Sequence, residues 1–362
     1  MNVSSTWAAL AAHIATATHA GPGSNVAIVT SGETTHDAVG ALVGEVYRRG
    51  GTPQVILADP EHEATALALA DQEVLATPGV LESYAIRWAD IYVAFRGMVP
   101  PTRGLADPKR RALLRAAQGA VSSLRWKQTR WCLVRVPTRA WAQMIGQDFD
   151  GLVQEFFAGC LGNWPAQRAE WEEWAKRLGQ VQRLRVVASG TDLRLSVSGR
   201  PWVVFAGEEN LPDGEIATAP VETSADGELA VPGPFWFAGE EIRDLVLTFR
   251  DGLLIDLSAR RGEQFARALC ETDAGASRVG EFGIGVSAAV RTVTGDLLID
   301  EKIMGTVHIA LGRAYAECGG TNKSVVHWDI VKDLRSPGSY LLADDSWPVV
   351  DEGRLAFAGR PS

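Results

Sequence analysis

Two side chains near the end of the chain have the types and spacing of metal ligands. His327 and Asp329 are separated by a single tryptophan, and alternate residues of a β-strand point to the same face. An imidazole and a carboxylate on one face can bind the same metal ion. Most His-x-Asp pairs in proteins have no such role, so this pair alone is a weak indication of a site.

Three further residues of the C-terminal half carry metal-binding groups, and each also has an ordinary structural interpretation. Glu281 lies in VGEFGIG, where glycines on both sides of a carboxylate suggest backbone held close to another group. The alternative is a glycine-rich turn with an exposed acid. Glu215 follows NLPDG, which could equally be a solvent loop. His308 lies in the apolar run GTVHIALG, where a lone histidine is more often a packed core residue.

Together these residues match what a pair of borderline-hard divalent ions requires. The set consists of Glu215, Glu281, His308, His327 and Asp329. Its three carboxylates and a hydroxide would balance two divalent cations, and a neutral cluster is far easier to bury than isolated carboxylates. Two ions would activate a water molecule. The phenol of Tyr315 could donate to the developing oxyanion, although Tyr315 could also be plain packing.

The first half of the chain alternates short apolar strands with helices, which is the pattern of βαβ units and a largely parallel sheet. The expected strands are 25–30, 52–59, 89–95 and 129–137, and the expected helices are 35–51 and 109–124. An amphipathic helix precedes them, and a helical stretch at 150–180 with a break near Pro165 follows. We therefore expect an α/β domain over residues 1–180.

The second half has the pattern of paired strands. A turn is expected at Ser189-Gly190, and Asp251-Gly252 between two apolar runs is a strong hairpin signal. A further hairpin is expected around Gly295. Residues 181–362 are therefore predicted to form an α+β domain with mainly antiparallel strands that carries the metal site.

Length and composition bound the class of protein. The 362 residues suggest two domains, and 46% hydrophobic with 22% charged residues is typical of a globular chain. A net charge of -9 argues against a nucleic-acid or anionic-membrane surface. The four scattered cysteines indicate a reduced, cytoplasmic setting rather than a disulfide framework. The N-terminus lacks the features of a signal peptide, and no apolar run is long enough to span a membrane.

Other motifs give no competing chemistry. His62-Glu63 lacks the second histidine of HExxH, because Ala66 stands in its place. The sequence contains no GxSxG motif of a serine hydrolase and no phosphate-binding loop. The candidate ligands of the C-terminal half therefore remain the leading indication of function.

The segments around these ligands resemble the aminopeptidase T and aminopeptidase S family of dinuclear metallopeptidases. The similarity is densest in NLPDGEIATAP (210–220), VGEFGIG (279–285) and DEKIMGTVHIALGRAYAECGGTNKSVVHWDIVKDLR (300–335). Weaker similarity occurs at 130–143 and 190–197, so the resemblance covers most of the chain. It implies zinc, cobalt or manganese ions, removal of N-terminal residues from peptides, and a homodimer around a large internal cavity.

The resemblance also implies a role for each candidate residue. The family's metal ligands fall on Glu215, Glu281, His308, His327 and Asp329. Its tyrosine falls on Tyr315, and either Glu215 or Glu281 could serve as general base. Ala217 and Met304 stand where the family leads us to expect a bulkier aromatic residue and a glycine, which could reshape the substrate pocket.

Three alternatives stay open at this point. The first is a mononuclear Fe(II) dioxygenase that cleaves rings of hydroxylated pyridines on the same scaffold, with His308, His327 and Asp329 as its ligands. Two unpaired glutamates beside a single iron would be costly, which favours two metals. The second is a specialised amide hydrolase of a biosynthetic or catabolic pathway. The third is a binding protein that has kept the fold and lost turnover.

Overall fold

The computed structural model describes residues 3–101 and 107–357, which form two compact units. One unit comprises the residues up to Trp164 together with Ala206–Asp213. The other comprises Pro165–Phe205 together with the residues from Gly214 onward. The chain therefore returns to the first unit for the short segment 206–213, which the sequence pattern did not indicate. The domain boundary placed at residue 180 stays a prediction.

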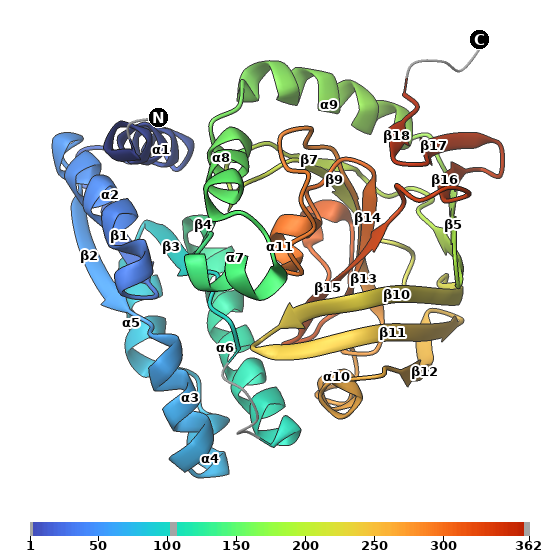
Figure 1. Ribbon diagram of the computed structural model, residues 1–362, viewed down its shortest axis with the longest axis horizontal. Coiled ribbons are helices and arrows are strands. Elements are labelled where there is room, and N and C mark those ends of the chain that lie inside the picture. Colours follow the sequence, from blue (N-terminus) through green and yellow to red (C-terminus); the bar gives the residue numbers. More distant parts are fainter. Residues whose placement is uncertain (1–2, 102–106, 358–362) are drawn as a thin grey trace. The chain divides into compact units, whose positions relative to one another are not determined.

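A parallel sheet forms the centre of the first unit (Figure 1). In the described part of the chain it has five strands in the order β2-β1-β3-β4-β8, and every neighbouring pair is parallel. The strands are β1 (Asn25–Thr30), β2 (Thr52–Leu57), β3 (Ile91–Gly97), β4 (Arg130–Val136) and β8 (Asn210–Leu211). The predicted parallel sheet is therefore confirmed, with β8 as an addition.

Helices cover this sheet on both faces. The connections from β1 to β2 and from β2 to β3 run in opposite directions across the sheet. Because such connections are right-handed, they place α2 and α3–α5 on opposite faces. The helices are α1 (Val3–Ala17), α2 (His36–Arg48), α3 (Pro60–Leu69), α4 (Gln72–Leu75), α5 (Val80–Trp88), α6 (Pro108–Gln128), α7 (Arg139–Ile145) and α8 (Phe149–Cys160), with η1 at Glu33–Thr35. Among the described helices, none is both long and apolar enough to cross a membrane.

The second unit contains two antiparallel sheets. The larger has the strand order β12-β11-β10-β6-β5-β16-β17-β18, and the smaller has the order β15-β14-β13-β9-β7. The larger sheet consists of β5 (Arg183–Ala188), β6 (Thr191–Ser196), β10 (Asp226–Phe237), β11 (Glu240–Arg250), β12 (Leu253–Ser258), β16 (Tyr340–Ala343), β17 (Trp347–Asp351) and β18 (Arg354–Leu355). The smaller consists of β7 (Val203–Phe205), β9 (Glu215–Thr218), β13 (Val279–Gly285), β14 (Thr306–Gly312) and β15 (His327–Asp333). The remaining elements are α9 (Trp164–Leu178), α10 (Glu263–Cys270), α11 (Leu297–Asp300) and η2 (Ala316–Cys318).

Two of the three predicted hairpins are confirmed. β5 and β6 pair across the turn at Ser189-Gly190, and β11 and β12 pair across Asp251-Gly252. Asp251 and Gly252 both have positive φ angles, of 51° and 76°, as the tight turns of hairpins require.

The hairpin predicted around Gly295 is wrong. The chain instead forms a loop that leads into the short helix α11. The buried carboxylate of Asp300 accepts hydrogen bonds from the backbone N–H groups of Thr294 and Gly295, at 2.7 Å each, and from the Thr294 hydroxyl at 2.8 Å. These bonds satisfy the polar groups that strand pairing would otherwise take up, and burial raises the pKa of Asp300 to about 7.

The edge strand β15 of the smaller sheet has two chemically different faces. Buried and partly exposed residues alternate along it. On the buried face, the Trp328 ring stacks on Phe237 with ring centroids 5.8 Å apart. The Lys332 ammonium on the same face donates to the carbonyl oxygens of Ala230 and Ser189, at 2.6 Å and 3.2 Å. This face therefore packs against the larger sheet, and the opposite face carries His327 and Asp329.

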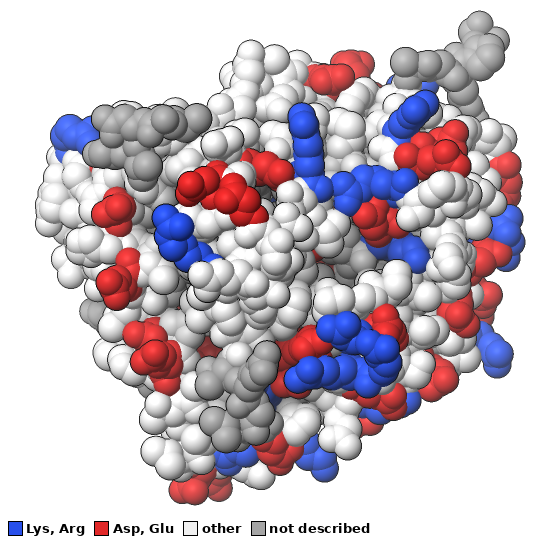
Figure 2. Space-filling model, in the orientation of Figure 1, with Lys and Arg blue, Asp and Glu red and all other residues white. Residues whose placement is uncertain are grey.

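The surface charge is mixed. On the face shown in Figure 2, acidic and basic side chains are interspersed and do not gather into one patch of a single sign. The net charge of -9 is therefore not concentrated in one area of that face.

We predict that Asp300→Asn lowers the free energy of unfolding by about 1–3 kcal/mol. An amide has one oxygen, so at least one of the buried N–H groups that Asp300 now binds would lose its acceptor. Urea unfolding of the purified protein would measure the difference. Asp226→Asn, at an exposed position of β10, is the matched control and should change stability little. An Asp300→Asn protein as stable as the wild type would contradict this role of the carboxylate.

Candidate metal centre

Four adjacent strands of the smaller sheet carry the predicted ligands. The order β15-β14-β13-β9 places residues that are far apart in sequence on neighbouring strands. Glu215 on β9 is opposite Gly285 on β13. Glu281 on β13 is opposite Ala310 on β14, which is in turn opposite Asp329 on β15. The same pairing sets His308 opposite Gly283 and His327 opposite Gly312, so all five side chains share one face.

The five predicted ligands lie close together. Glu281 is between the two histidines, with Oε1 at 3.7 Å from Nε2 of His308 and Oε2 at 3.6 Å from Nε2 of His327. Oδ1 of Asp329 is 3.3 Å from Nε2 of His327, and Oε2 of Glu215 is 3.9 Å from Nε2 of His308. The structure therefore brings together every ligand candidate chosen from the sequence, and their binding of metal stays a prediction.

The site is buried at one end and accessible at the other. The side chains of His308, Glu281 and Glu215 are 1%, 4% and 6% exposed. His327 and Asp329, on the edge strand, are 14% and 21% exposed. Solvent therefore reaches the cluster beside the edge strand.

Tyr315 lies at this accessible end. Its ring centroid is 4.7 Å from that of His327, and the Arg313 guanidinium carbon lies 5.7 Å from the tyrosine ring. Burial raises the pKa of Tyr315, although the charge of Arg313 and its hydrogen bond to the phenol lower it in part. The phenol therefore stays protonated near neutral pH and can act as a hydrogen-bond donor.

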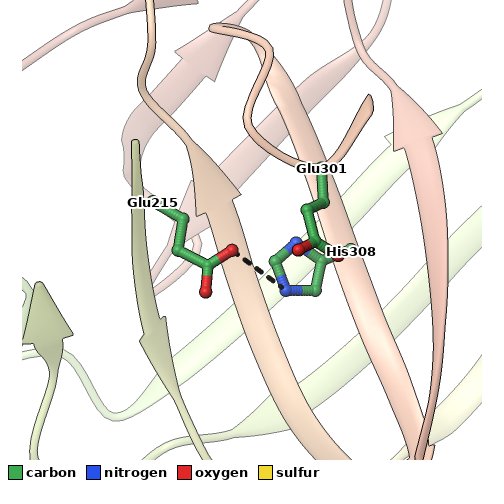
Figure 3. Close-up of side chains that lie close together, drawn as sticks. All are labelled: Glu215, Glu301 and His308. Carbon is green, nitrogen blue, oxygen red and sulfur yellow. Dashed lines mark ion pairs between the residues drawn. The ribbon is translucent and has the colours of Figure 1, made fainter. Parts of the chain in front are cut away.

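Two residues that the sequence analysis did not select complete the cluster. Glu301 directly follows α11. Its carboxylate forms a group with the Glu215 carboxylate and the His308 imidazole, and one ligand atom from each lies within 4.8 Å of the other two (Figure 3). The Lys302 side chain is fully buried, and its ammonium donates to Glu215 at 2.6 Å and to Glu301 at 2.7 Å. The charged string Asp300-Glu301-Lys302 before the strand of His308 was the available signal in the sequence.

Glycines of β13 make room for these groups. A β-carbon at position 283 would overlap with the imidazole ring of His308. A β-carbon at position 285 would overlap with the backbone carbonyl oxygens of Glu301 and Ile303, which pass across the strand at this point. The close backbone approach that the sequence suggested around Glu281 is therefore confirmed.

The carboxylates and histidines shift one another's pKa values. Burial by itself lowers the pKa of His308, but a hydrogen bond to Glu281 and the charges of the surrounding glutamates outweigh it and raise the pKa to about 9. Burial also opposes ionisation of Asp329, yet the charge and hydrogen bond of His327 hold the pKa of Asp329 well below its usual range. For Glu301, burial dominates and raises the pKa, with Lys302 as the main opposing charge. The cluster is thus a set of acids whose burial requires compensating cations.

Several buried atoms of the cluster have unused hydrogen-bonding capacity. Among the described residues, none forms a hydrogen bond to Oε2 of Glu281, to Oε2 of Glu301 or to Nδ1 of His308. Buried polar atoms without a partner are costly, and carboxylate oxygens and imidazole nitrogens are metal-binding atoms. His327 is already oriented, because its Nδ1–H donates to the carbonyl oxygen of Arg313 at 2.8 Å and leaves Nε2 facing the carboxylates. The residues present therefore fit a site for divalent metal ions.

Comparison with known families supports this interpretation. The model of the family described as "Thermophilic metalloprotease (M29)" matches residues 4–344. The chain is similar to aminopeptidase T of Thermus thermophilus, with 27% identity over 349 residues that cover 81% of this chain and 84% of the relative. The range that the family model matches contains all six predicted site residues.

Two solved structures share the fold. Wild-type AmpT from Thermus thermophilus matches with a TM-score of 0.78 at 24% identity, covering 97% of this chain and 99% of that chain. The 2,5-dihydroxypyridine dioxygenase from Pseudomonas putida KT2440 matches with a TM-score of 0.58 at 16% identity, covering 98% of each chain. These likenesses confirm the predicted fold class, a parallel α/β part followed by an antiparallel α+β part.

We predict that Gly283→Ala destabilises the protein by about 1–3 kcal/mol, because the added methyl group overpacks the position of the His308 ring. Chemical unfolding of the metal-free protein would measure the loss. Gly40→Ala is the matched control. It adds the same methyl group in helix α2, where the new carbon would meet no atom within 4 Å other than those of its own helix backbone. If Gly283→Ala were as stable as the control variant, the close packing of His308 on this strand would be wrong.

Proposed function

The chain belongs to the thermophilic metalloprotease (M29) family, and from this premise we propose that it removes N-terminal residues from peptides with two divalent metal ions. Family membership and the similarity to aminopeptidase T make it a metal-dependent hydrolase of the aminopeptidase class. The number of ions, their identity and the role of each residue are the finer parts of the proposal. Zinc, cobalt or manganese would suit the mixture of imidazole and carboxylate donors.

The position of Glu281 is the observation that carries the dinuclear proposal. One of its oxygens faces His308 and the other faces His327. Glu215 and Glu301 are grouped with His308, whereas Asp329 is beside His327. The donors therefore divide into two sets with Glu281 between them, and we assign one ion to each set.

The charge of the enlarged cluster supports the same number of ions. Glu215, Glu281, Glu301 and Asp329 carry four negative charges when ionised, and the Lys302 ammonium compensates one of them. Two divalent cations with one accompanying monoanion would balance the remaining three. A neutral buried cluster avoids the large cost of isolated charges, so the addition of Glu301 and Lys302 leaves the charge balance expected from the sequence intact.

The residues around the ions have separable roles. When bound, the ions would lower the pKa of water and polarise the peptide carbonyl. We assign the general base to Glu281, because Glu215 is tied to Lys302 while Oε2 of Glu281 accepts no hydrogen bond among the described residues. Tyr315 lies at the accessible end of the site and would donate its phenolic hydrogen to the oxyanion.

The substrate would reach the site beside the edge strand, where His327 and Asp329 are partly exposed. A peptide or small amide with a free amino group matches an acidic, metal-bearing site. The dioxygenase alternative is not favoured, because the family model and the sequence relative are those of peptidases, whereas the dioxygenase is similar in fold alone. A cytoplasmic location and a homodimer stay predictions.

We predict that Glu281→Gln lowers turnover of an aminoacyl amide by about 100- to 10,000-fold, the range expected for loss of a general base. Circular dichroism should show an unchanged fold. Glu263→Gln is the matched control, because Glu263 lies on α10 and its carboxylate pairs with Arg267 at the surface. His327→Ala should lose metal as well as activity. Full activity in Glu281→Gln or His327→Ala would count decisively against the proposed site.

Metal content distinguishes the proposal from its alternative. We expect metal-free protein reloaded with zinc, cobalt or manganese to bind two equivalents per chain and to hydrolyse members of a panel of aminoacyl amides. Elemental analysis by mass spectrometry and an amidase assay would measure the two quantities. One equivalent of iron per chain, together with oxygen consumption on a dihydroxypyridine and no amide hydrolysis, would contradict the hydrolase proposal.

A further inference from the structure

Lys302 is a cation in the interior of the candidate metal centre. Its side chain is 0% exposed, and its ammonium binds one oxygen of Glu215 at 2.6 Å and one of Glu301 at 2.7 Å. Both carboxylates belong to the group that, with His308, could hold a metal ion. An ammonium buried between two metal-binding carboxylates requires an explanation, because a positive charge beside a metal ion repels it.

The geometry of the two bonds gives that explanation. Lys302 binds Oε1 of Glu301, and Oε2 of the same carboxylate is buried with no hydrogen bond from any described residue. The Lys302 bond thus fixes the rotation of the carboxylate and leaves the second oxygen for another partner. In Glu215 the oxygen that accepts from Lys302 is also the one nearest His308, at 3.9 Å. The ammonium therefore holds both acids toward the imidazole.

The backbone also holds Lys302 in this place. Its carbonyl oxygen accepts a hydrogen bond from the N–H of Ser287 at 2.9 Å, which ties the segment after α11 to the chain beyond β13. The neighbouring residues Glu301 and Ile303 cross Gly285 at a distance that no side chain would allow. The segment 301–303, which crosses β13 at Gly285, therefore holds both the Lys302 ammonium and the Glu301 carboxylate in place.

We propose that Lys302 is a positioning residue of the metal centre, which holds Glu215 and Glu301 in the orientation that binds one of the two ions. This inference rests on the proposed function. Residues that orient metal ligands typically contribute about 10- to 100-fold to metal affinity. Lys302→Met should therefore weaken binding at the site formed with His308 by about that factor, or abolish one equivalent of metal.

The direction of the effect separates positioning from simple charge compensation. If Lys302 served only to offset the acids, its removal would take a positive charge away from the ions and would strengthen metal binding. Weaker binding in Lys302→Met, measured well above the pKa range of carboxylates, therefore supports lost orientation of the carboxylates. A purely structural role would lower stability and leave affinity unchanged.

Lys332 provides a matched control. It is also a buried lysine of this unit, 4% exposed, but its ammonium donates to the backbone carbonyl oxygens of Ser189 and Ala230. Lys332→Met should lower thermal stability, because it removes a buried lysine together with its hydrogen bonds. It should bind metal with the affinity of the wild type.

The test is titration of the metal-free, full-length protein with Co²⁺. Calorimetry measures the affinity and the number of ions bound, and visible absorption records the spectrum of the bound ion. The expected result is a 10- to 100-fold weaker site, or one equivalent lost, in Lys302→Met, with an altered Co²⁺ spectrum, and wild-type behaviour in Lys332→Met. Unchanged or tighter binding in Lys302→Met would overturn the inference. Absence of Co²⁺ binding by the wild type would instead refute the proposed function.

A second variant covers the case in which Lys302→Met does not fold. Lys302→Arg keeps the charge but moves the donors, because the guanidinium is larger and planar. It should bind the same ion more weakly than the wild type, and wild-type affinity together with the wild-type spectrum would overturn the inference.

Discussion

The burial of four carboxylates in one small region is the constraint on which the rest of this structure depends. Glu215, Glu281, Glu301 and Asp329 cannot all remain ionised in an apolar environment unless cations lie among them. Within the protein, Lys302 and the two histidines supply part of this compensation. The remaining negative charge suits the region to divalent ions, and it explains why imidazoles lie among the acids.

The antiparallel sheet satisfies this constraint because of its regular geometry. Adjacent strands bring side chains from distant parts of the sequence within a few ångströms, and alternation sends them to one face. On the same face, Ala217, Gly283, Ala310 and Gly312 occupy the positions beside the ligands. Their small size leaves space among the donors. The opposite face of the edge strand packs through Trp328 and Lys332 on the larger sheet.

The fold does not by itself specify the reaction. This chain has the architecture of an aminopeptidase T structure and, less closely, that of a dihydroxypyridine dioxygenase. The same scaffold therefore occurs with very different chemistry, and the function must be argued from the donor set. A carboxylate between two histidines, with further acids on each side, is suited to binding ions that activate water. The sequence relatives agree with this interpretation.

The sequence by itself determined the fold class and five of the metal-ligand candidates. It could do so because strand and helix periodicity are local properties, because a metal-binding side chain is recognisable by its type, and because the resemblance to a known family supplied the spacing. Only the tertiary structure decided that Glu301 and Lys302 join the site, since they reach it through a loop that crosses Gly285. It also decided that Asp300 closes a turn where a hairpin was expected, and that residues 206–213 return to the first unit. These outcomes depend on contacts between segments far apart in the chain, and no local pattern of residue types records such contacts.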